Sequence, residues 1–208
     1  MPILEKLKRL RRPLKSRNSL HEYWTDPQEP GNLATDYIEA PGRSEYLIGL
    51  FRDHFEPPAS VLEVGCNVGR NLHYALEAGY DASGIEISER AIEEMRRAYP
   101  DVAERATLHV GPVEEIIKTL PADSHDAVFT LAVLEHIHPD SEWIFGEMVR
   151  VAKGHIVVIE DEVEYTPRHT PRNYKDVFES LGARQVFESH GEVPEVGPNY
   201  VARVFAVA

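Results

Sequence analysis

The sequence is poor in cysteine and has no long apolar segment. Its single cysteine, Cys66, excludes an internal disulfide and is typical of a protein from a reducing compartment. A membrane-spanning helix needs an apolar run of about 18 residues, which does not occur, and we identify no signal peptide. We therefore expect a cytoplasmic protein.

Basic residues are also scarce: 22 lysines and arginines stand against 35 aspartates and glutamates, and the formal net charge is −13. Affinity for nucleic-acid phosphates comes mainly from lysine and arginine, so this composition argues against a general nucleic-acid binder. The bases gather in residues 1–17, where seven of them accompany one acid, Glu5. We predict a separate basic N-terminal extension with a short amphipathic helix, either a docked tail or a weak contact with a membrane or nucleic acid.

The rest of the chain, residues 18–208, has a length that fits one domain. From residue 58 on, apolar strand-like runs alternate with amphipathic helical patterns, which predicts an α/β core with a largely parallel sheet and helices on both faces. The strands are expected at 61–64, 82–85, 106–110, 127–131, 155–159, 184–188 and 200–207. The stretch "HGEVPEVGPN" connects the last two without a helical period, so these two should pair antiparallel.

Residues 18–57 are predicted to form an N-terminal cap. The segment 18–40 is expected to be irregular, and 43–55 reads as a helix that leads into the first strand. The aromatic stretch "LHEYWTDP" could fold over the open edge of the sheet as a lid, or place Trp24 in the core.

The stretch "VLEVGCNVGRN" joins the first predicted strand to a glycine turn. It is not a phosphate-binding P-loop, because Gly69 is followed by Arg70 and Asn71. A dinucleotide site needs a middle glycine beside the pyrophosphate, and here that residue is Asn67, which still tolerates a left-handed backbone. Glu63 would repel a phosphate and suits an ammonium group. The alternative is an ordinary strand-to-helix turn.

Residues 63–69 resemble the first motif of class I S-adenosylmethionine-dependent methyltransferases, E/D-x-G-x-G-x-G, with asparagine in place of the middle glycine. The resemblance implies S-adenosyl-L-methionine as cofactor, S-adenosyl-L-homocysteine as product, and a Rossmann-like, doubly wound sheet of seven strands whose last strand is antiparallel. It assigns cofactor binding to five residues of the turn, namely Glu63, Gly65, Cys66, Asn67 and Gly69.

The same resemblance extends to the ends of the second and third predicted strands. Glu86, followed by Ile87, takes the place of the acid that holds the ribose hydroxyls, and a carboxylate can accept two hydrogen bonds from a vicinal diol. After the third strand, Pro112 replaces the usual acid. Val113 is expected to contact adenine, while Glu114 either contacts the cofactor or caps the next helix.

The stretch "DAVFTLAVLEHIHP" resembles a segment of small-molecule methyltransferases of the quinone-biosynthesis type. This resemblance puts Leu131 at the ligand edge of the sheet and makes His136 the leading candidate for a general base, followed by His169 and Glu160. Some such enzymes hold a divalent cation with E-x-x-E-H. Here Ala132 replaces the first glutamate, so we predict no metal.

The chain is therefore predicted to transfer a methyl group from S-adenosylmethionine to an oxygen or nitrogen atom of a small-molecule acceptor. The acidic run 160–164 favours a cationic or polyhydroxylated acceptor, unless it is a solvated loop. Two alternatives remain: a protein or RNA methyltransferase that uses the basic N-terminus, and a catalytically silent cofactor-binding module. The oligomeric state is left open.

Overall fold

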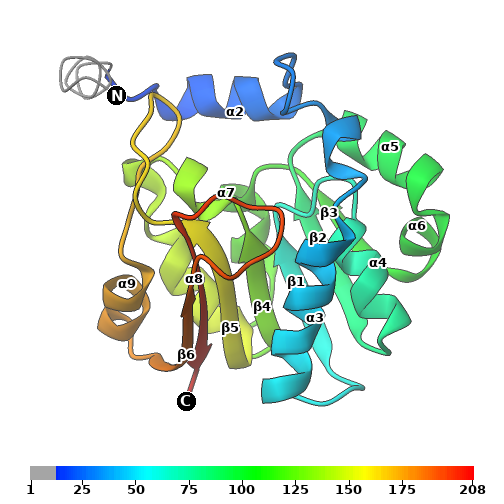
Figure 1. The fold of residues 1–208 in the computed structure, drawn as a ribbon, viewed down its shortest axis with the longest axis vertical. Coiled ribbons are helices and arrows are strands. Elements are labelled where there is room, and N and C mark those ends of the chain that lie inside the picture. The colour runs from blue at the N-terminus through cyan, green and yellow to red at the C-terminus, as the bar shows by residue number, and fades with distance from the viewer. Residues whose placement is uncertain (1–12) are drawn as a thin grey trace.

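The computed structural model describes residues 13–208, which form one seven-stranded sheet between two layers of helices (Figure 1). The strands are β1 (Ser60–Val64), β2 (Asp81–Glu86), β3 (Thr107–Val110), β4 (His125–Leu131), β5 (Ala152–Asp161), β6 (Arg184–His190) and β7 (Tyr200–Ala206). Their order is β3-β2-β1-β4-β5-β7-β6; β7 pairs antiparallel with both β5 and β6, and all other pairs are parallel. The predicted fold, including the antiparallel last strand, is confirmed.

Four helices pack on one face of the sheet: α3 (Pro41–His54), α4 (Arg70–Glu77), α5 (Glu89–Ala98) and α6 (Pro100–Arg105). The other face is covered by α7 (Val113–Ile116), the short 3-10 helix η2 (Ile117–Thr119), α8 (Ile144–Val151) and α9 (Tyr174–Ser180). Within residues 13–208, no helix is long and apolar enough to cross a membrane. Most of the predicted amphipathic helix at the N-terminus lies outside the described residues.

Alternate residues of the central strands supply the cores of the two layers. Val61, Phe129 and Val157 are fully buried under one helical layer, and Leu62 and Val128 are fully buried under the other. Successive side chains of a strand point to opposite faces, so a strand covered on both sides is largely apolar. This is why these segments read as continuous apolar runs.

The carboxyl ends of the parallel strands meet at one edge of the sheet, and helix α2 (Arg17–Thr25) lies across this edge (Figure 1). Ser16 caps α2, because its side chain accepts a hydrogen bond from the Ser19 N–H. The prediction that 18–40 is irregular was wrong, since it contains α2 and the 3-10 helix η1 (Ala34–Tyr37). Helix α6, which begins with a proline, was also missed.

The packing of the layer formed by α3 to α6 can be tested by a substitution at Phe51 of α3. It is fully buried and its ring contacts those of Phe55, Tyr80 and Phe129 at centroid distances of 5.0 to 5.5 Å. Phe51→Ala should lower the free energy of unfolding in urea by about 3–5 kcal/mol, because it leaves a cavity. Leu181→Ala, at a residue that is 41% exposed, is the control. Equal losses in the two variants would contradict this packing.

Candidate functional site

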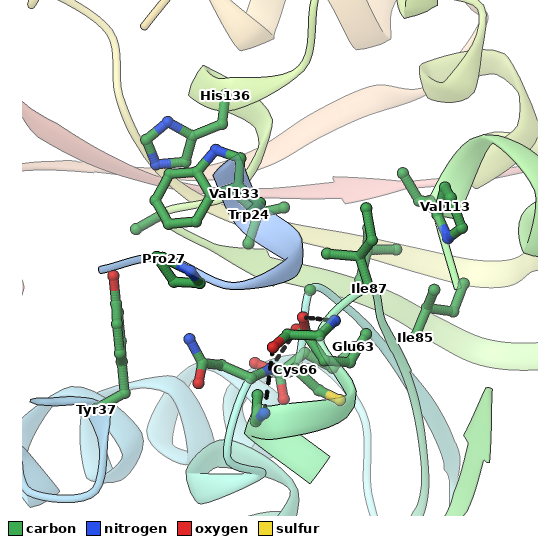
Figure 2. A pocket seen from close by; sticks show the side chains of 18 of the residues that line it. Trp24, Pro27, Tyr37, Glu63, Cys66, Ile85, Ile87, Val113, Val133 and His136 are labelled. Atoms are coloured by element: carbon green, nitrogen blue, oxygen red, sulfur yellow. Dashed lines mark hydrogen bonds between the residues drawn. The ribbon is translucent and has the colours of Figure 1, made fainter. Parts of the chain in front are cut away.

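A cavity of about 170 Å³ lies between the carboxyl edge of the sheet and α2. Figure 2 shows Trp24 and His136 at one end, Glu63 and Cys66 opposite, and Ile85, Ile87 and Val113 on a third side. Of the ten predicted cofactor-binding residues, nine line this cavity: Glu63, Gly65, Cys66, Asn67, Glu86, Ile87, Val113, Glu114 and Leu131. The sequence motifs therefore converge on one place.

The turn between β1 and α4 has three residues with left-handed backbone: Gly65 at φ +72°, Asn67 at φ 45° and Gly69 at φ +75°. Asparagine fits here because it tolerates this conformation better than other residues with a side chain. A Cβ atom at Gly65 would lie 2.7 Å from Val133, so the two loops require glycine there. Gly69 does not line the cavity; it caps α4 and packs closely against Met95.

Glu63 lies at the floor of the cavity and is only 2% exposed. Its Oε1 accepts a hydrogen bond of 2.6 Å from Asn71 Nδ2, while its Oε2 is buried and has no partner among the described residues. Burial raises the pKa of Glu63 to about 8. A carboxylate with an unused oxygen, facing a cavity, is suited to a cationic group.

Four arginines line the cavity, among them Arg70 and Arg43. Arg70 is buried and donates to two neutral oxygens, Ser44 Oγ at 3.0 Å and the Tyr37 carbonyl at 2.8 Å. Burial lowers the pKa of Arg70 from its ordinary value. Arg43 also lines the cavity, and its Nε finds no hydrogen-bond partner within residues 13–208. Neither arginine was predicted as a site residue. Arg70 belongs to the stretch that contains the glycine turn, whereas Arg43 lies outside every motif.

Glu86 stands at the end of β2 and supports the glycine turn. Its two oxygens accept hydrogen bonds from the backbone N–H groups of Asn67 at 2.7 Å and Ser88 at 2.8 Å. Burial raises the pKa of Glu86, while these hydrogen bonds act in the opposite direction. Each oxygen has a second lone pair, so the carboxylate can still accept hydrogen bonds from a ligand.

Glu114 connects the cavity wall to the overlying helix. Its Oε1 lies 2.9 Å from His21 Nε2 of α2 and accepts a 2.9 Å hydrogen bond from Ser141 Oγ. The sequence left open whether this residue contacts the cofactor or caps a helix; in the structure its carboxylate fastens α2 to the core. Trp24, from the same helix, contacts His136, with ring centroids 4.4 Å apart and ring planes tilted by 45°. Helix α2 thus forms a lid.

Glu160, predicted as a catalytic candidate, does not line the cavity. Its carboxylate accepts hydrogen bonds from Thr130 Oγ1 and from the N–H groups of Val133 and Leu134, at the start of the 3-10 helix η3 (Leu134–His136). Its position makes it a support for the loop after β4. None of residues 160–164 lines the cavity, so the argument from this acidic run to a cationic acceptor is not supported.

His136 borders the cavity, but its chemistry differs from the prediction. Its Nδ1 lies 3.2 Å from the Arg168 carbonyl, and burial lowers the pKa of His136 to about 3. The imidazole is therefore neutral across the physiological range, and a base with such a low pKa is weak near neutral pH. His169 does not line the cavity; its ring packs edge-on against that of His136 at 4.5 Å.

Glu135, which was not predicted as a site residue, forms a cluster with these two histidines. One possible ligand atom from each of Glu135, His136 and His169 lies within 4.8 Å of the other two. The sequence predicted no metal, because position 132 is alanine. His169 joins this cluster from the loop between β5 and α9, which no local motif could indicate.

Residues 62–158 match the family described as Methyltransferase domain. A curated relative, the S-adenosyl-L-methionine-dependent Diels-Alderase iccD of Talaromyces variabilis, is 29% identical over an alignment of 110 residues that covers 49% of this chain. The match spans 36% of that relative, so the chain corresponds to about a third of its length.

Solved structures share the fold. The magnesium protoporphyrin IX methyltransferase of Synechocystis, with bound S-adenosylhomocysteine, superposes with a TM-score of 0.70 at 14% identity and covers 93% of this chain and 100% of that chain. The 1,6-didemethyltoxoflavin-N1-methyltransferase of Burkholderia thailandensis superposes with a TM-score of 0.65 at 16% identity. The match covers 100% of this chain and 91% of that chain. The family match and the shared fold support the predicted class I S-adenosylmethionine-dependent methyltransferase. The quinone-biosynthesis subtype stays a prediction.

The raised pKa of Glu63 has a consequence for stability. Between its ordinary value of 4.5 and about 8, the folded protein keeps a proton that the unfolded chain releases, so the free energy of unfolding should fall as pH rises through this window. Glu63→Gln should reduce the slope, which urea titrations at pH 5 and pH 8 measure. Other buried acids with a raised pKa, such as Glu86, also make the free energy of unfolding fall as pH rises, so part of the slope should remain in the variant. Identical slopes in both proteins would refute the assignment.

Proposed function

We propose that this methyltransferase domain binds S-adenosylmethionine in the cavity and transfers its methyl group to an oxygen or nitrogen atom of a small-molecule acceptor. The observation that carries the proposal is that the lining of this one cavity includes an acid and a base that each have a buried polar atom without a partner among residues 13–208. Glu63 presents an unpartnered carboxylate oxygen, and Arg43 presents an unpartnered guanidinium nitrogen. Together they complement the ammonium and carboxylate groups of an amino acid, which the methionine part of the cofactor carries.

The other parts of the cavity fit the rest of this cofactor. Glu86 is placed to accept hydrogen bonds from ribose hydroxyls, and Ile87 and Val113 offer apolar surface to a flat base (Figure 2). Asn67 Oδ1 is a further buried acceptor without a partner among residues 13–208. When bound, the cofactor supplies an activated methyl group on its sulfonium; the protein's part is to hold and orient the reactants.

The proposed acceptor is a small molecule because of what surrounds the other end of the cavity. Trp24 and His136 lie there, Pro27 and Tyr37 border the cavity from one side (Figure 2), and α2 covers the opening. Aromatic walls under a helical lid suit a compact, partly apolar acceptor and exclude water from the reaction. A macromolecular acceptor would have to displace this helix.

A second candidate function is favoured by the name of the curated relative, a Diels-Alderase that depends on S-adenosylmethionine. On this alternative the chain would bind the cofactor without consuming it. Incubating the protein and methyl-labelled cofactor with pools of small metabolites separates the two. Transfer of label together with S-adenosylhomocysteine release supports methyl transfer, whereas acceptor conversion with intact cofactor supports the alternative.

The first test of the proposal is calorimetry with S-adenosylhomocysteine and NAD. The former should bind and the latter should not. An ammonium group beside Glu63 favours the ionised carboxylate, so binding at pH 7 should release a proton, measured as a dependence of the heat on the ionisation enthalpy of the buffer. Glu63→Gln should lose this release. Binding of NAD alone would falsify the proposal.

The second test concerns Glu86. Glu86→Ala should weaken S-adenosylhomocysteine binding by about 1.5–3 kcal/mol, the range for hydrogen bonds to a charged group, while the protein stays folded. Because Glu86 also holds the N–H groups of the glycine turn, the melting temperature must be measured in parallel. Glu93→Ala, an exposed acid on α5, is the matched control. Unchanged affinity in Glu86→Ala would place the ribose elsewhere.

A further inference from the structure

The charged side chains around the cavity bear on the kind of acceptor that it suits. The lining includes three acids and four arginines, namely Glu63, Glu86, Glu114, Arg17, Arg43, Arg70 and Arg90. A charge that already has a partner within the protein contributes little to a ligand, whereas a charge without one favours a ligand of the opposite sign. The partners of these side chains therefore indicate the charge of the acceptor.

The acids leave no unpaired carboxylate for an acceptor on the part of the lining that lies within residues 13–208. The proposed function gives Glu63 and Glu86 to the cofactor. The third acid, Glu114, is engaged from two sides: its Oε1 lies 2.9 Å from His21 Nε2 and accepts a 2.9 Å hydrogen bond from Ser141 Oγ. A cationic acceptor would therefore find no carboxylate to pair with.

Three of the four arginines are also accounted for. Arg70 is buried and donates to neutral oxygens, and the proposed function gives Arg43 to the carboxylate of the cofactor. Nη1 of Arg90 lies 3.2 Å from Asp26 Oδ1. The guanidinium of Arg17 has neither an ion pair nor a hydrogen bond in the described part of the chain. Within residues 13–208, it is the lining charge that remains for an acceptor.

Arg17 is the first residue of α2 and shares the cavity-facing side of this helix with Trp24. The two residues are seven positions apart, which corresponds to about two turns of an α-helix, and His21 lies between them on the same face. The start of α2 lies against the loop between β5 and α9, because the Lys15 N–H donates to the Pro167 carbonyl at 2.8 Å. The lid thus presents a cation and an aromatic ring to the cavity.

Trp24 offers a second hydrogen-bond donor. Its Nε1 is buried and has no partner within residues 13–208, and an indole N–H can only donate, so it needs an acceptor atom such as an oxygen. The indole contacts His136 (Figure 2) and packs edge-on against Tyr23, with centroid distances of 4.4 and 5.0 Å. Tyr23 is in turn covered by the guanidinium of Arg168 at 4.2 Å. This packing holds the indole as a flat wall.

We propose that the acceptor is a flat molecule that carries an acidic oxygen group, such as a carboxylate, and that Arg17 and Trp24 select it. This inference rests on the proposed function, which places an acceptor under α2. A guanidinium presents a planar pair of N–H donors that matches a carboxylate. The indole supplies an apolar face for the ring of the acceptor and one N–H for an oxygen atom.

The two donors are spaced for one molecule. Residues seven positions apart lie about 10 Å apart along a helix, and the long side chain of Arg17 can shorten this span. An aromatic ring beside Trp24 can therefore place its acidic group within reach of Arg17. The acidic group anchors the acceptor, and an amine in its place would be repelled.

The test compares benzoate with benzylamine, two probes that share a ring and carry opposite charges at pH 7. Each is titrated into the full-length, ¹⁵N-labelled protein, with and without S-adenosylhomocysteine. The chain has two tryptophans, so two indole N–H signals are expected, and Trp143→Phe assigns them. Benzoate should bind and shift the Trp24 signal, while the signal of Trp143, which does not line the cavity, stays unchanged. Benzylamine should shift neither.

Arg17→Gln should weaken benzoate binding about fivefold, the upper range for an exposed ion pair, and Arg17→Lys should restore part of it. Arg96→Gln is the matched control, because this exposed arginine lies on α5 outside the cavity lining. Circular dichroism checks that each variant is folded. Benzoate that does not bind, benzylamine that binds equally well, or equal benzoate affinities in Arg17→Gln and Arg96→Gln would each overturn the inference.

The two proposals fail in different ways. Binding of S-adenosylhomocysteine without a preference for benzoate refutes the acidic acceptor alone. A preference for benzoate that depends on Arg17, in a protein that does not bind S-adenosylhomocysteine, refutes the proposed function and leaves a site for acidic molecules under α2.

Discussion

Buried carboxylates at the ends of parallel strands hold together the edge on which the candidate site is built. Where a strand ends and the chain turns, backbone N–H groups lose their partners in the sheet and must find others. Glu86 at the end of β2 accepts from the glycine turn, and Glu160 near the end of β5 accepts from the loop after β4. Each carboxylate thus fixes the loop of a neighbouring strand, so the walls of the cavity are set by the sheet.

This arrangement stores unfavourable electrostatic energy. Burial raises the pKa values of Glu63, Glu86 and Glu160, since a carboxylate loses its hydration when the surrounding side chains exclude water. The apolar layers on both faces of the sheet offset that cost. A cationic group that enters beside Glu63 would relieve part of this cost, so ligand binding and folding are coupled at this edge.

Helix α2 completes the site from outside the core. It contributes Trp24, whose ring lies against that of His136, and His21, which pairs with Glu114. It also buries the side chain of Leu20, and the cavity lies beneath it.

The fold could be predicted from the sequence because it depends on local patterns. Largely apolar runs such as 61–64 and 155–159 indicate strands buried on both faces, and the glycine turn from Gly65 to Gly69 requires left-handed backbone. Glu63 and Glu86 could be placed in the site for the same reason, since each follows from its position at a strand end. Helix α2 was missed although Leu20, Tyr23 and Trp24 have helical spacing, because its stability comes from packing on the cavity rim.

What the sequence determined by itself is therefore the sheet, its order of elements and the acids of the glycine-turn site. Tertiary structure decided the rest. It turned Glu160 away from the cavity, made His136 a buried neutral imidazole, and brought Arg43 and His169 to the edge from segments without a motif. Burial, and contacts between residues far apart in the chain, set the protonation and partners of a side chain. Neither is encoded in the spacing of its neighbours.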